Sequence, residues 1–316
     1  MKTKYLVSFL VIILIVAFYT IHIKYKQDLN TNTKRINSFE SKIFKSSECD
    51  LEYMLMGTGP TILVSHGVTG GIDQGIGLST RYLGQGYRCL YVSRFGYLRS
   101  SFPDHPTPKL QAKVYKELLD FLDIDSVFIL GNSAGGASAV NLAIEYPEKC
   151  QGLILVSSIV PRNDNALPPK LFMKTVFGSD LLFWTTIKLF GRSMLQMFVP
   201  EAVQEKLSKE ERRVLIKEVL LSGFPISKRT KGVLFDTYIS NPSVNEELEY
   251  SKIASPTLIL HAVDDPAPPI EGARLISKKI PRSELITFET GGHLILNHEE
   301  EIKNIIHGFV YKQINE

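Results

Sequence analysis

Residues 127–136 decide the fold and have the sequence Val127-Phe128-Ile129-Leu130-Gly131-Asn132-Ser133-Ala134-Gly135-Gly136. The first four are apolar and favour a buried strand, and the residues after Ser133 are compatible with a helix. A serine in such a tight strand–turn–helix connection is typical of a nucleophile elbow, which projects the hydroxyl from the end of a sheet. Helix capping would explain a serine at this position, but not the small residues at 131 and 135. We therefore predict that Ser133 is a nucleophile.

Two partners for this serine follow along the chain. A serine hydroxyl is a poor nucleophile and needs an adjacent base. His293 suits that role, because it follows a strand predicted at 284–289 and its Gly-Gly turn would let the ring reach across the sheet. An acid must hold the ring in the correct tautomer, and the Asp264-Asp265 pair supplies one. The other histidines that we considered are assigned elsewhere. His66 belongs to the loop after strand 61–65, His261 ends a strand, and His298 and His307 lie on a helix near the C-terminus.

Strand and helix patterns alternate from about residue 39 to residue 160. A hairpin is predicted over 41–45 and 51–56, followed by strands at 61–65, 88–93, 127–130 and 153–157. Helices are predicted between them at 73–85, 108–122 and 134–146. Such alternation indicates an α/β fold with a mostly parallel central sheet and helices on both faces.

The alternation stops after Val160. Residues 161–250 are rich in helix formers and contain no convincing buried strand. Strand character returns at 257–261 and is followed by a helix at 270–279, a strand at 284–289 and a helix at 298–313. We predict a core formed by 39–160 and 251–316, with 161–250 as a helical insertion over one end of the sheet.

The N-terminus predicts a membrane segment. Lysines at 2 and 4 precede an uncharged run from Tyr5 to Ile21. As a helix this run would be roughly 26 Å long, close to the thickness of a bilayer core. No small-x-small cleavage site follows it, so we favour an uncleaved anchor over residues 1–25 above a removed signal peptide or a buried helix. The polar residues 26–38 are expected to be a linker, with the protein at a membrane on an undetermined side.

Composition narrows the possible functions. The apolar fraction of 44% supports a substantial core, so we expect one large domain carrying an inserted lobe. The net charge is +3, and we find no basic stripe with interleaved aromatics, so a nucleic-acid partner is not expected. Cys49, Cys89 and Cys150 lack metal-ligand spacing and are expected to be inert thiols, although two could pair outside the cytosol. We expect neither a metal nor an organic cofactor.

The motifs together resemble one family. The sequence His66-Gly67-Val68-Thr69-Gly70, the elbow at 133 and the late Asp265 and His293 occur in the order of an α/β-hydrolase with a helical cap, over roughly residues 39–316. The resemblance implies that Asp265 rather than Asp264 is the acid, because Ala262 occupies the place of a family glycine three residues before the acid. It also implies a structural turn at 93–97, where Ser93 replaces the usual aspartate.

An oxyanion hole needs two backbone donors where negative charge develops. We assign these donors to the N–H groups of Ala134, directly after the nucleophile, and of Val68, in the loop after strand 61–65. A glycine-rich turn without function is the alternative for that loop. It is not a phosphate loop, because the lysine that such a loop requires is missing.

The combined pattern predicts a serine hydrolase. We expect it to cleave an ester or related acyl bond of a fairly apolar small molecule through an acyl-enzyme. Many large apolar side chains lie in the insertion, although such residues are more often core than pocket. Hydrolysis of a C–C bond, amidase, thioesterase and perhydrolase activity use the same triad, and a ligand-sensing protein could share the scaffold. The substrate and the oligomeric state stay open.

Overall fold

The computed structural model describes residues 2–161, 167–245 and 248–315 of the chain. In these residues an eight-stranded sheet has the order β1-β2-β4-β3-β5-β6-β7-β8. The strands are β1 (Lys42–Lys45), β2 (Asp50–Gly57), β3 (Thr61–Ser65), β4 (Arg88–Val92), β5 (Val127–Asn132), β6 (Cys150–Val156), β7 (Thr257–Ala262) and β8 (Ser283–Phe288). β2 pairs antiparallel with β1 and β4, and all other pairs are parallel. The predicted α/β fold class is confirmed.

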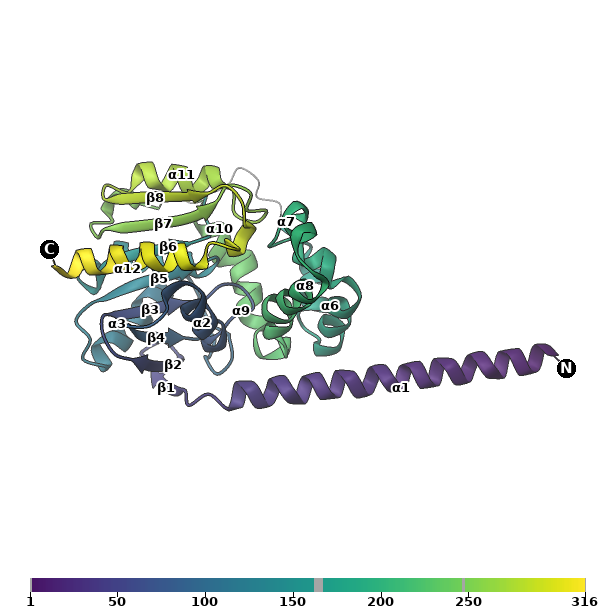
Figure 1. Ribbon diagram of the computed structural model, residues 1–316. Helices are drawn as coiled ribbons and strands as arrows, with labels where there is room; N and C mark the ends of the chain where they lie inside the picture. Colours follow the sequence, from purple (N-terminus) through teal and green to yellow (C-terminus); the bar gives the residue numbers. More distant parts are fainter. Residues whose placement is uncertain (1, 162–166, 246–247, 316) are drawn as a thin grey trace.

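Helices cover both faces of the sheet (Figure 1). Along β3, Leu63 packs in one apolar layer while Ile62 and Val64 pack in the other, as the alternation of side chains along a strand requires. The first layer includes side chains of α3, α4 and α11, and the second those of α2 and α12. These helices are α2 (Ile72–Leu78), α3 (Pro108–Phe121), α4 (Gly135–Glu145), α11 (Ile270–Lys279) and α12 (Glu299–Asn315).

Local sequence explains where α3 begins. The side chain of Thr107 caps the helix by accepting the Leu110 N–H at 2.9 Å, and Pro108 occupies the first turn, where its missing N–H costs nothing. Residues with helical spacing then bury one face, which includes Val114 and Leu118. The predicted helix at 108–122 therefore agrees with the observed one to within a residue.

Only helices and short helical turns occur between β6 and β7 in the described residues. The α-helices are α5 (Lys170–Val176), α6 (Asp180–Leu195), α7 (Glu201–Lys206), α8 (Lys209–Leu215), α9 (Thr230–Phe235) and α10 (Asn241–Ser243). We call the described residues of 167–252 the insertion. Its apolar cluster includes Trp184, Phe224 and Val233 and also takes in Tyr97, which lies outside the insertion. Figure 1 shows it at one end of the sheet. Residues 162–166 and 246–247 of the predicted insertion lie outside the described residues.

The predicted membrane anchor is wrong. In the part of the chain that the structure describes, we find no helix of sufficient length and apolarity to cross a bilayer. The prediction treated the apolar run and the polar residues 26–38 as an anchor and a linker. The structure instead forms one continuous helix, α1 (Lys2–Asn37), whose N-terminal end projects beyond the insertion (Figure 1). The predictions of a membrane localisation and of a membrane partner depended on this anchor, and neither is supported.

The C-terminal third of α1 packs against the insertion. Asp28 accepts a hydrogen bond from Trp184 Nε1 at 2.8 Å and forms an ion pair with Lys188 at 2.9 Å. The Tyr25 ring meets the Trp184 ring edge-on, with centroids 5.7 Å apart. These contacts explain why a segment without apolar periodicity is helical, because tertiary packing supplies most helix stability in proteins.

Candidate active site

Ser133 lies in the turn between β5 and α4 with a strained backbone. Its φ is +49°, a left-handed conformation that non-glycine residues rarely adopt. Its carbonyl accepts hydrogen bonds from the N–H groups of Gly136 and Ile159, at 3.0 and 2.9 Å. Strain of this kind persists only where surrounding contacts maintain it, and it concentrates at functional sites.

Close packing around this turn explains its small residues. A Cβ added to Gly135 would overlap the carbonyl oxygen of Ser65, and one added to Gly131 would lie 2.8 Å from the Cβ of Ala139. Real side chains essentially never make such contacts. Residues 131 and 135 must therefore be small because α4 and the sheet approach each other closely there.

His293 and Asp265 meet at the carboxyl ends of β8 and β7. The Nδ1 of His293 lies 2.8 Å from Oδ2 of Asp265, whose side chain is fully buried. Because a carboxylate only accepts hydrogen bonds, Nδ1 carries the proton in the neutral ring and Nε2 is left as the basic nitrogen. Among the described residues, Ser133 Oγ makes no hydrogen bond to this histidine.

Asp264 has a different set of partners from its neighbour. Its carboxylate accepts the N–H groups of Gly291 and Gly292, at 3.2 and 2.8 Å. Both glycines have positive φ, so the turn before His293 is a tight one. Asp264 thus holds the backbone of the histidine loop, whereas Asp265 contacts the imidazole itself.

The loop after β3, residues 66–71, which we call the oxyanion loop, is held by side chains. The buried His66 accepts the Arg94 N–H at Nε2 (3.0 Å), so its Nδ1–H donates to the Gly67 carbonyl at 2.7 Å. Burial and the nearby Arg94 lower the pKa of His66 well below its usual value, which agrees with a neutral ring. Gln74 accepts the N–H of Gly67 at 2.7 Å.

Two backbone amides remain available beside Ser133. The N–H groups of Val68 and Ala134 donate to no atom of the described residues. Ala134 is almost fully buried, and Val68 packs at the margin of the insertion's apolar cluster. Two unused donors near a serine hydroxyl could stabilise developing negative charge on a substrate oxygen.

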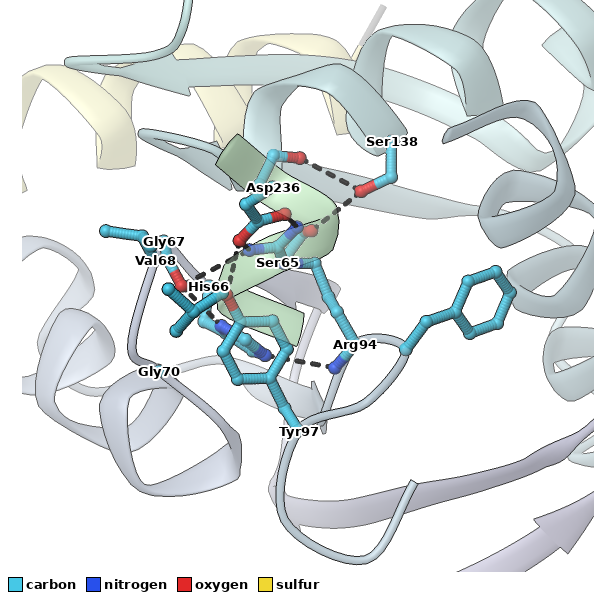
Figure 2. A network of polar contacts seen from close by, with 12 residues as sticks. Ser65, His66, Gly67, Val68, Gly70, Arg94, Tyr97, Ser138 and Asp236 are labelled. Atoms are coloured by element: carbon cyan, nitrogen blue, oxygen red, sulfur yellow. Dashed lines mark hydrogen bonds and ion pairs between the residues drawn. The ribbon is translucent and has the colours of Figure 1, made fainter. Parts of the chain in front are cut away.

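A buried ion pair joins the oxyanion loop to the insertion (Figure 2). Arg94 in the turn after β4 binds both oxygens of Asp236, at 2.6 and 2.5 Å, and also donates to the Gly67 carbonyl at 3.3 Å. The hydroxyl of Tyr97 donates to the same carboxylate. Burial and Asp236 raise the pKa of Tyr97, so its hydroxyl stays protonated. Sequence patterns missed this network, because Asp236 lies far from Arg94 along the chain.

The insertion also contacts the histidine loop and the oxyanion loop directly. The His293 N–H donates to the Phe198 carbonyl at 2.7 Å, and the two rings lie 5.8 Å apart. On the other side, a Cβ on Gly223 would lie 3.0 Å from the Cβ of Thr69, so the turn around residue 223 packs closely on the oxyanion loop. The insertion thus contacts both the turn that contains His293 and the oxyanion loop.

Comparison with known proteins assigns the family. The model of the α/β-hydrolase fold matches residues 60–298, well over half of the sequence. The chain belongs to the α/β-hydrolase fold family. It is an enzyme of the hydrolase type, as its relatives are.

Two curated relatives span most of this α/β hydrolase. An uncharacterized hydrolase, YcgS, from Bacillus subtilis is 28% identical, covering 82% of this chain and 94% of the relative. A 2-hydroxy-6-oxononadienedioate/2-hydroxy-6-oxononatrienedioate hydrolase from Comamonas testosteroni is 25% identical, covering 83% and 87%.

Solved structures share the fold. An α/β hydrolase fold protein from Nakamurella multipartita has a TM-score of 0.66 at 23% identity, covering 87% of this chain and 98% of its own. An esterase from Exiguobacterium antarcticum has a TM-score of 0.63 at 20% identity, covering 83% and 96%.

Proposed function

We propose that this α/β hydrolase is a serine hydrolase that cleaves an ester or related acyl bond of a fairly apolar small molecule. Ser133 is the nucleophile, His293 the base and Asp265 the acid of its triad. The observation that carries the proposal is the strained backbone of Ser133, with φ of +49°, at the same sheet edge as the His293–Asp265 hydrogen bond.

The reaction proceeds in two half-reactions. His293 Nε2 takes the hydroxyl proton as Ser133 Oγ attacks the substrate carbonyl, and the amides of Val68 and Ala134 stabilise the resulting oxyanion. The tetrahedral intermediate collapses to an acyl-enzyme, and the leaving group departs with the proton from His293. Water then attacks the acyl carbon, again with His293 as base, and the acid product leaves.

The surroundings favour an apolar acyl or alcohol group. Val68 packs against an apolar cluster whose members include Met173, Phe177, Met194 and Phe198. The two cations that donate to the oxyanion loop, Arg94 and Arg229, are both engaged by buried aspartates. A charged substrate would therefore lack an available counter-charge there.

Hydrolysis of a C–C bond is the second candidate. Several relatives are named as hydrolases of 2-hydroxy-6-oxo acids, and a structural neighbour is a meta-cleavage product hydrolase. Because those acids carry carboxylates, the engagement of Arg94 and Arg229 favours the ester over this class.

The test measures hydrolysis of a p-nitrophenyl ester series by the full chain. Turnover should be detectable and should favour medium or long acyl chains over acetate. Ser133→Ala should abolish it, whereas Ser138→Ala, which removes another hydroxyl from the start of α4, should keep most of it. Undiminished turnover by Ser133→Ala would exclude the assignment. Turnover of a 2-hydroxy-6-oxodienoic acid, without esterase activity, would favour the second candidate.

A further inference from the structure

Asp73 is a buried carboxylate that the proposed reaction does not use. It lies in the first turn of α2, directly after the oxyanion loop, and its side chain is 3% exposed. Two guanidinium groups bind it. Arg229 of the insertion contacts both oxygens, at 2.8 and 3.1 Å, and Arg35 of α1 contacts Oδ2 at 2.8 Å.

Arg229 also binds the oxyanion loop itself. Its Nη1 donates to the Gly70 carbonyl, and its side chain is completely buried. The Gly70 N–H in turn donates to the Gly67 carbonyl at 3.3 Å, which closes the turn that contains Val68. The position of the Val68 amide is thus linked to the position of Arg229.

A second path connects α1 with the same loop. The Ser222 carbonyl accepts hydrogen bonds from Arg35 at 2.8 Å and from Arg229 at 3.3 Å. The next residue, Gly223, packs on Thr69 of the oxyanion loop. Tyr25 of α1 packs on Phe224, with ring centroids 6.0 Å apart. Both ends of the α1 segment 25–35 therefore brace the turn that supports the loop.

We propose that residues 25–35 of α1 belong to the scaffold of the active site, and that Arg35 is a positioning residue for the oxyanion loop through Asp73 and Arg229. The catalytic part of this inference rests on the proposed function. Arg35 touches no reacting atom, but it supplies one of two guanidinium groups on Asp73 Oδ2 and one of two on the Ser222 carbonyl. Without Arg35, Arg229 alone would bind the Asp73 carboxylate and the carbonyl groups of Ser222 and Gly70.

The charges of this cluster persist at neutral pH. Burial by itself would raise the pKa of the Asp73 carboxyl, but Arg229 and Arg35 beside it hold that pKa well below its usual range. The carboxylate is therefore ionised throughout the range in which a serine hydrolase works.

The experiment compares Arg35→Ala with Lys34→Ala in the full chain. Lys34 is exposed and lies one residue earlier on the same helix, so its variant removes the same charge without touching Asp73. For p-nitrophenyl butyrate we expect Arg35→Ala to lower kcat about tenfold, with KM within about twofold. A misplaced Val68 N–H would stabilise the transition state less, while binding of the substrate would change little. Lys34→Ala should match the wild type. Arg35→Lys, which keeps one donor, should recover part of the loss, and it replaces Arg35→Ala if that variant does not fold.

Hydrogen exchange of the peptide covering residues 66–71 supplies a readout independent of turnover. Exchange should be faster in Arg35→Ala than in the wild type and unchanged in Lys34→Ala. Unchanged exchange in the loop, or unchanged kcat per folded molecule, overturns the positioning role. If the wild type shows no turnover that depends on Ser133, the proposed function fails, while exchange still decides whether α1 holds this loop.

Discussion

The turn that contains Ser133, called the nucleophile turn for its proposed role, and the oxyanion loop lie at the same edge of the sheet but are held in different ways. Ser133 is constrained by backbone groups: glycines in its turn admit close approach to β3, and its carbonyl accepts the N–H groups of Gly136 and of Ile159, after β6. The oxyanion loop is instead held by side chains from distant parts of the chain. Its carbonyl groups accept hydrogen bonds from Arg94 and Arg229, and each of these cations is paired with a buried aspartate.

The geometry of the two regions therefore depends on the sequence in different ways. A turn held by backbone groups needs only a short motif of small residues, because its partners supply N–H and carbonyl groups that nearly every residue carries. A loop held by buried ion pairs depends on the insertion, which supplies Arg229 and Asp236, and on α1. We expect loss of a side chain of the proposed triad to affect mainly chemistry, and loss of a buried ion-pair partner on the oxyanion side to affect stability and chemistry together.

The largest effect should come from the aspartate on the nucleophile side. Asp265→Asn should lower kcat by about 10⁴-fold, because an amide no longer favours the tautomer with a basic Nε2. Asp264→Asn is the matched control, since Asp264 holds only backbone N–H groups, and we expect a loss of about tenfold or less. Steady-state kinetics on one ester decides the outcome. Equal losses in both variants would contradict the assignment of Asp265.

On the oxyanion side, Asp236→Asn should cost about 3–5 kcal/mol of unfolding free energy, because it leaves the Arg94 charge buried without its partner. The control is Glu249→Gln, which removes an exposed ion pair with Lys252 and should cost about 1 kcal/mol or less. Urea unfolding measures both. A cost below about 1 kcal/mol for Asp236→Asn would show that the pair does not anchor the insertion.

Close approach at the nucleophile turn predicts a smaller loss of stability. Gly135→Ala should destabilise the protein by about 1–3 kcal/mol, because the new methyl group overlaps the Ser65 carbonyl. Gly308→Ala, in α12 with open space around it, should instead stabilise by up to about 1 kcal/mol. Thermal or urea unfolding compares the two variants. A neutral Gly135→Ala would mean that the strand and helix can separate at no cost.

Acid should weaken both regions through buried histidines. Burial lowers the pKa of His66, in the oxyanion loop, and of His261, beside Asp265. The unfolded chain then binds more protons, so their contribution is fully present above about pH 6.5 and is lost as the pH falls towards the folded pKa values. The loss should reach at most about 1.4 kcal/mol per pH unit for each group.

Urea unfolding between pH 7.5 and 5 measures this slope. His261→Gln should reduce it, and His307→Gln, which changes an exposed side chain of α12, should leave it unchanged. A pH-independent stability of the wild type over this range would contradict the neutral state of both rings.

Features set by short stretches of sequence could be predicted, and features set by distant residues could not. The strand at 61–65 and the helix at 270–279 have the predicted bounds, because their periodicity is local. The elbow around Ser133 was recognisable for the same reason. The choice between Asp264 and Asp265 rested on one family glycine position. Asp265 contacts the His293 ring and Asp264 binds backbone N–H groups, and the assignment of the acid stays a prediction.

Long-range contacts account for what sequence patterns missed. Arg94 and Asp236 are 142 residues apart, and Asp73 and Arg229 are 156 apart, so no motif links them. The helix over 26–37 was missed because its side chains lack apolar periodicity. Its partners, among them Trp184 and Asp73, lie in other elements.

The central claim is that Ser133 is an activated nucleophile, and covalent labelling tests it most directly. The full chain is treated with a fluorophosphonate, and intact mass and peptide mapping locate the adduct. We predict one adduct per molecule, on the peptide that contains Ser133, and none in Ser133→Ala. A folded wild-type chain that stays unlabelled, or that is labelled only at another residue, would contradict the account.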